Sequence, residues 1–127
     1  MITYNKVINA GKGLKKISDL DIKIREAIAL SKLIKKLDEE SVFYFEQREK
    51  ICRDCGVFDK EKDAYFIPEE NRETVRKKMN ELDNTEVEFG EKLKINVSEG
   101  TTIDALSLIL CEDFVEFIIE GDIENGN

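Results

Sequence analysis

The segment that decides the fold is residues 22–55, IKIREAIALSKLIKKLDEESVFYFEQREKICRDC. It contains neither Gly nor Pro, and Lys, Glu, Ile, Leu and Ala dominate it, a composition that favours a helix. Its apolar and small residues recur at helical spacing in two neighbouring stripes. The first stripe comprises Ile24, Ile28, Ser31, Ile34, Val42, Phe45, Cys52 and Cys55, and the second comprises Leu30, Leu33, Leu37, Tyr44 and Ile51. We therefore predict one long helix that packs against more than one partner element.

The run VFYF at residues 42–45 covers nearly every direction around this helix. One interpretation is that both faces are buried there, against a hairpin and a C-terminal helix. The other is a contact surface for a second subunit or another protein, because exposed aromatic patches mark interfaces. On that interpretation Phe43 and Tyr44 are the candidate contact residues.

The helix ends in CRDCG, which raises the question of a metal or redox site. The chain has no histidine and only one further cysteine, Cys111, so four Cys or His ligands for zinc do not exist in a single chain. Three cysteines with an aspartate, or cysteine pairs shared across a dimer, stay open. A redox pair favours a helix N-terminus, whereas Cys52 and Cys55 lie at a C-terminus. We interpret them as core-facing residues of the last turn and predict no metal or cofactor, with Gly56 turning the chain through a left-handed conformation.

The next segment predicts a β-hairpin followed by a second helix. Apolar arms flank a charged loop at residues 59–63, and Pro68 with two glutamates opens a helix that runs to Leu82. Residues 85–97, TEVEFGEKLKINV, alternate apolar and polar side chains on either side of Gly90. They predict two short strands or one strand with a bulge.

The two ends of the chain are the remaining elements. Residues 2–8 are rich in β-branched side chains and predict a short strand or an extended lead-in. Near the C-terminus, Thr101 and Asp104 resemble a capping box. The apolar residues from 103 to 119 then predict a buried C-terminal helix. Three glutamates would form an acidic stripe on that helix and are candidate interface residues: Glu112, Glu116 and Glu120.

Length and composition predict one α+β domain at residues 1–120, with a flexible acidic tail at residues 121–127. The chain has 127 residues and a net charge of −8, and no Lys or Arg follows Lys94. An acidic C-terminal third disfavours nucleic acid as a partner and favours a basic protein surface. No signal peptide or membrane span is expected, because no apolar run is long enough.

Two alternative functions rest on particular residues. The Gly-rich segment NAGKGLKK places Lys12, Lys15 and Lys16 beside backbone amides that could bind an anion, as in a small nucleotide- or second-messenger-binding protein. The many carboxylates leave open a hydrolase that uses carboxylates and a divalent ion. The absence of histidine removes Ser-His-Asp and Cys-His catalysis.

Several segments together resemble a family of small uncharacterised proteins of tailed bacteriophages and prophages of low-GC Gram-positive bacteria. They are NKVINAGKGLKKI, ALSKLIKKLDEESVFYFEQREKI, IPEE, MNELDNTEVEF and TTIDALSLILCEDFVEF, of which NELDNTEVEF is the most specific. The family has no assigned catalytic residues to transfer. The resemblance implies a non-enzymatic accessory protein in the cytoplasm of an infected bacterium. It would bind a host or phage protein, either to interfere with defence or regulation or to assist virion assembly, and we expect it to form a homodimer.

Overall fold

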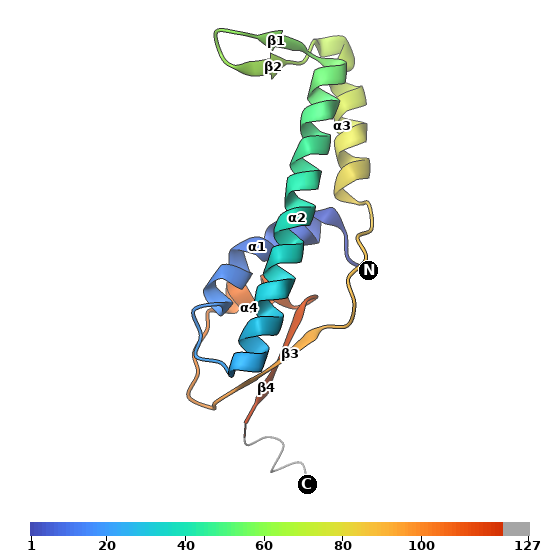
Figure 1. Cartoon of the computed structure of the whole chain (residues 1–127). Coiled ribbons are helices and arrows are strands. Elements are labelled where there is room, and N and C mark those ends of the chain that lie inside the picture. The colour runs from blue at the N-terminus through green and yellow to red at the C-terminus, as the bar shows by residue number, and fades with distance from the viewer. Residues whose placement is uncertain (121–127) are drawn as a thin grey trace.

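The computed structural model describes residues 1–120 and confirms the predicted α+β class (Figure 1). Its elements are, in order, α1 (Tyr4–Ile17), α2 (Ile24–Cys55), β1 (Val57–Asp59), β2 (Ala64–Phe66), α3 (Glu69–Asp83), β3 (Leu93–Val97), α4 (Ala105–Cys111) and β4 (Val115–Ile119). The tail expected at residues 121–127 lies outside the described residues. Among the helices of residues 1–120, none combines the length and hydrophobicity of a membrane-spanning segment.

Helix α2 joins two parts of the molecule, as Figure 1 shows. Its 32 residues span roughly 48 Å at about 1.5 Å per residue. Its N-terminal half lies in a body with α1, α4, β3 and β4. Its C-terminal half projects from that body beside α3, and the antiparallel β1–β2 hairpin extends sideways from the far end. We call this projecting part, residues 40–84, the arm.

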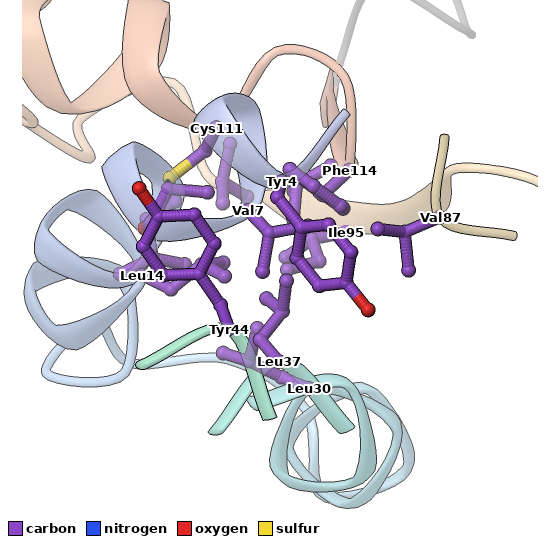
Figure 2. Close-up of a cluster of buried hydrophobic side chains, with 14 residues drawn as sticks. Tyr4, Val7, Leu14, Leu30, Leu37, Tyr44, Val87, Ile95, Cys111 and Phe114 are labelled. Atoms are coloured by element: carbon purple, nitrogen blue, oxygen red, sulfur yellow. Dashed lines mark hydrogen bonds between the residues drawn. The ribbon is translucent and has the colours of Figure 1, made fainter. Parts of the chain in front are cut away.

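The first element differs from the prediction, because residues 2–8 belong largely to a helix and not to a strand. Helix α1 buries Val7, Ala10, Leu14 and Ile17, whose spacing is helical and directs all four side chains into the body. Figure 2 shows Val7 and Leu14 among side chains from α2 and β3. Packing of this face outweighs the strand preference of β-branched residues and the two interior glycines.

The C-terminal helix is shorter than predicted. Helix α4 ends at Cys111, and after a turn the chain continues as β4, parallel to β3, with Val115 opposite Leu93. The N-cap of this helix is Asp104 and not Thr101, so the predicted capping box is wrong; the Asp104 carboxylate accepts a hydrogen bond from the backbone N–H of Ser107. Composition explains the change: Leu-rich residues precede Cys111, whereas β-branched and aromatic residues dominate 115–119.

Only the second half of segment 85–97 forms a regular strand. The first half makes a single bridge, between Thr3 and Glu86, and no bulge forms at Gly90. Strand β3 is held on one side by α2, where the Glu26 carboxylate accepts hydrogen bonds from the backbone N–H of Asn96 at 2.7 Å and from its side-chain amide at 3.0 Å. On this side of β3 the Asn96 N–H is therefore bonded to α2, and on the other side the strand pairs with β4.

Candidate protein-interaction surface

The two apolar stripes of α2 have different surroundings. In the second stripe, Leu30, Leu37 and Tyr44 are buried against the body and the arm. The first stripe largely faces solvent: the exposed fractions are 77% for Ile24, 52% for Ile28, 58% for Val42 and 53% for Phe45. The prediction that α2 packs against more than one partner element is confirmed by its contacts with α1, α3 and β3, but these elements leave most of the first stripe exposed.

Tyr44 and Phe43 have separate roles. Tyr44 is buried, and its hydroxyl donates a hydrogen bond to the Asp83 carboxylate at the end of α3. Burial, followed by this carboxylate, raises the Tyr44 pKa. Phe43 lies on another side of α2 and is half-exposed, with its ring centroid 6.1 Å from that of Tyr4. Of the two candidate interface residues, Phe43 lies at the surface and Tyr44 fastens the base of the arm.

A second phenol–carboxylate bond lies next to the first. The Tyr4 hydroxyl donates to a Glu40 carboxylate oxygen at 2.8 Å, and this joins α1 to α2. Burial, together with the neighbouring Glu40 carboxylate, raises the Tyr4 pKa to about 12. The arm is thus anchored where α1, α2 and α3 meet.

The hairpin adds apolar surface at the tip of the arm. Val57 and Phe66 are cross-strand partners and share one face, with exposed fractions of 62% and 59%. On the opposite face the Phe58 and Tyr65 rings contact each other edge to face at 5.3 Å. The sequence analysis does not predict Val57 or Phe66 as surface residues. The available signal is that apolar residues occupy both faces of this short hairpin, although a hairpin needs only one apolar face to pack against the rest of a protein.

Gly56 is needed for a different reason from the one predicted. Its φ is −126°, which is extended and not left-handed. A Cβ at this position would lie 2.6 Å from the Cys52 carbonyl oxygen and 2.8 Å from that of Phe66. The glycine therefore allows the hairpin to start in close contact with the last turn of α2.

The cysteines do not form a metal-binding group in the part of the chain that the structure describes. Cys52 and Cys55 are half-buried and unbonded to each other, and Cys111 is buried between α1 and α4. Burial raises the Cys111 thiol pKa to about 11. Within residues 1–120 no three Cys, Asp or Glu side chains are arranged to hold a metal ion.

The three candidate glutamates are exposed, but the predicted helical stripe is wrong. Glu112 lies in the turn after α4, Glu116 lies on β4, and Glu120 follows that strand. The Lys94 residue pairs with Glu116 in the β3–β4 register, and the Lys23 ammonium lies 3.3 Å from the Glu120 carboxylate. These acids therefore follow the length of a strand instead of one face of a helix.

The Gly-rich segment that was predicted to bind an anion forms part of helix α1 and not a loop. Lys12, Lys15 and Lys16 lie in the second half of α1, where the backbone N–H groups are used within the helix. The Lys16 ammonium lies 3.5 Å from the Asp104 carboxylate. An anion at this position would contact lysine side chains but would find no free backbone N–H groups to bind it.

Comparison of the chain with known protein families, characterised proteins and solved structures found no match.

Proposed function

We propose that this protein is a non-enzymatic accessory protein of a tailed bacteriophage that binds other proteins, including a second copy of itself, in the cytoplasm of an infected bacterium. The observation that carries the binding role is the solvent-exposed first stripe of α2. Large apolar side chains repeated along one helix face are stabilised by burial against a partner. The phage context rests on the sequence resemblance alone.

The first stripe is complementary to itself when two α2 helices run antiparallel. If a two-fold axis passes near Lys35, Ile28 of one copy lies level with Val42 of the other. The same alignment brings Lys32 level with Asp38, so opposite charges flank the apolar contact. An isologous dimer has this kind of repeated contact.

The exposed faces of the hairpin are the part of the arm that this pairing leaves for another protein. Val57 and Phe66 present an apolar pair at the end of a rigid projection. A host-defence protein, a regulatory protein or a virion component would meet this end first. Such a contact is consistent both with interference with a host protein and with a role in virion assembly.

The homodimer is tested by sedimentation of the purified protein and a Val42→Glu/Phe45→Glu variant. Full burial of a Phe side chain contributes about 1.5–3 kcal/mol. Phe45 is half-exposed, so burying the exposed half in both copies of the dimer contributes roughly this amount in total. Loss of Phe45 alone should weaken dimerisation about 10- to 100-fold. Phe66→Glu is the control, because the hairpin lies outside the proposed pairing.

Charge exchange provides the sharper test. Lys32→Asp should weaken the dimer, and adding Asp38→Lys should restore it, with circular dichroism confirming an unchanged fold. A wild-type protein that stays monomeric at micromolar concentration, or a charge exchange with no effect, would refute the pairing.

The accessory role is tested by affinity capture from an expressing bacterial host with the wild type and with a Val57→Glu/Phe66→Glu variant. We expect one stoichiometric partner that the variant loses. Equal recovery by both proteins would show that the hairpin is not the contact.

A further inference from the structure

Strand β4 forms the outer edge of the small parallel sheet. Its ladder with β3 is fixed at both ends, where the Leu93 N–H donates to the Phe114 carbonyl oxygen at 2.9 Å and the Glu120 N–H donates to the Val97 carbonyl oxygen at 2.8 Å. Backbone groups alternate sides along a strand, so this register turns the N–H and C=O groups of Phe117 and Ile119 away from β3.

These four outward groups have no backbone or side-chain hydrogen-bond partner within residues 1–120. The outward side of β3 instead packs against α2, and its Asn96 N–H is bonded to the Glu26 carboxylate of that helix. A two-stranded parallel sheet with one closed and one open edge has room for one further strand, on β4. Addition of an extended segment to such an edge is a common mode of peptide recognition.

An apolar cavity of about 430 Å³ lies at the end of this edge. Its lining is mainly apolar and includes Phe117, Ile119, Val97, Ile103 and Leu108, together with Glu99 and three hydroxyl-bearing residues of the loop before α4. A strand added to β4 would place alternate side chains on this same face of the sheet. The cavity therefore suits an aliphatic side chain of the added strand, while the backbone groups hold its main chain.

The acidic residues around β4 favour a basic partner at this strand edge. The exposed acidic residues Glu112, Glu116 and Glu120 lie in the turn before β4, within β4 and directly after it, and every charged residue after Lys94 is acidic. Lysines already lie close to two of these glutamates, Lys23 by an ion pair and Lys94 by strand register, whereas Glu112 makes no ion pair within residues 1–120.

A second copy is a poor occupant. Antiparallel pairing across a two-fold axis would place the acidic start of one β4 beside the acidic end of the other, and adjacent like charges are destabilising. A segment that carries lysine or arginine beside its apolar residues would instead place opposite charges next to these glutamates, which stabilises the pairing.

We propose that the outer edge of β4 binds an extended, basic segment of a partner protein by strand addition, with an aliphatic side chain of that segment in the adjoining cavity. This surface is separate from α2 and the arm, so its failure and the failure of the proposed dimer are measured independently.

The test uses a fluorescein-labelled peptide, Lys-Val-Lys-Ile-Lys-Val-Lys, with fluorescence polarisation and amide hydrogen exchange. On binding, the N–H groups of Phe117 and Ile119 should gain protection. Those of Glu116 and Ile118 should change little, because they already bond to β3. A Lys-Gly-Lys-Gly-Lys-Gly-Lys peptide has the same charge and should bind at least about tenfold more weakly, as should a peptide with Glu in place of Lys.

The protein variants separate the backbone from the side chain. Ile119→Pro removes an outward N–H without removing a ladder bond, whereas Ile119→Ala keeps that N–H and removes a similar side chain. The Pro variant should bind about tenfold more weakly than the Ala variant. The proposal is wrong if the two variants bind equally, if the Lys-Gly peptide binds as well, or if Ile119→Pro instead abolishes self-association. Hydrogen exchange of the wild type decides the matter even if a variant fails to fold.

Discussion

Helices α1 and α4 approach so closely at Gly13 that the position has room only for hydrogen. A methyl group there would lie 2.6 Å from the Cys111 sulfur, 3.0 Å from the Ser107 carbonyl oxygen and 3.2 Å from Leu110 Cβ. Replacing Gly by Ala inside a helix normally stabilises by about 0.5–1 kcal/mol. Overpacking a filled interior costs about 1–3 kcal/mol, and the Ser107 oxygen belongs to the backbone, which cannot rotate away. We therefore expect Gly13→Ala to destabilise the protein by about 1–2 kcal/mol.

The same helix supplies the control, because a methyl group at Gly11 meets no atom within 4 Å. Gly11→Ala should raise the free energy of unfolding by about 0.5–1 kcal/mol, while Gly13→Ala lowers it. Urea denaturation followed by circular dichroism measures both. In a Gly13→Ala/Cys111→Ala double variant the nearest clash is gone, so the two effects should be clearly non-additive. If Gly11→Ala and Gly13→Ala stabilise equally, the close contact of α1 with α4 is incorrect.

Three further changes test other parts of the fold. Gly56→Ala should cost about 2 kcal/mol or more in urea denaturation, because its methyl group would lie within 2.8 Å of two backbone carbonyl oxygens, whereas Gly90→Ala, with open space around it, should be nearly neutral. Glu26→Ala should cost about 1–3 kcal/mol by leaving the Asn96 N–H without its acceptor, and an unchanged urea midpoint would contradict that role. The Cys111 thiol pKa is raised from 9.0 to about 11, so the unfolded chain releases this proton first and stability should fall as the pH rises from about 9 to 11. Melting temperatures across that range should decline less steeply for Cys111→Ala, and parallel curves would show that the thiol does not contribute.

Sequence patterns predict those elements whose information is local. Helix α2 follows from an unbroken helical period, and the hairpin and α3 follow from a charged loop and from Pro68. Helix α1 is not predicted from the sequence because the contacts that stabilise it come from distant parts of the chain. For example, the Cys111 thiol donates a hydrogen bond to the Ala10 carbonyl oxygen, 101 residues away in sequence. The run after Asp104 was misassigned because a continuous apolar segment fits a buried helix and a buried strand equally well.

The candidate surface was only partly predictable for a similar reason. Periodicity identified both stripes of α2, but only the arrangement of the other elements decides which stripe is covered. Phe43 was singled out by composition, whereas exposure of Val57 and Phe66 depends on the hairpin extending sideways from the arm. Glu116 was correctly expected at the surface, on an element of the wrong type.

The contact of α1 with α4 also sets an order of assembly during synthesis. The arm is complete once residue 84 has been made, and the longest of its anchoring bonds, from Tyr44 to Asp83, spans 39 residues. The side of α1 that packs on α4 must wait for residues 85–120, which a ribosome adding roughly 5–20 residues per second supplies about 2–7 s after residue 84. In that interval the arm can form and α1 can pack on α2, while the side of α1 that faces α4 still lacks its partner and exposes apolar surface. A chain that stops before residue 105 would keep this side of α1 without the helix that covers it.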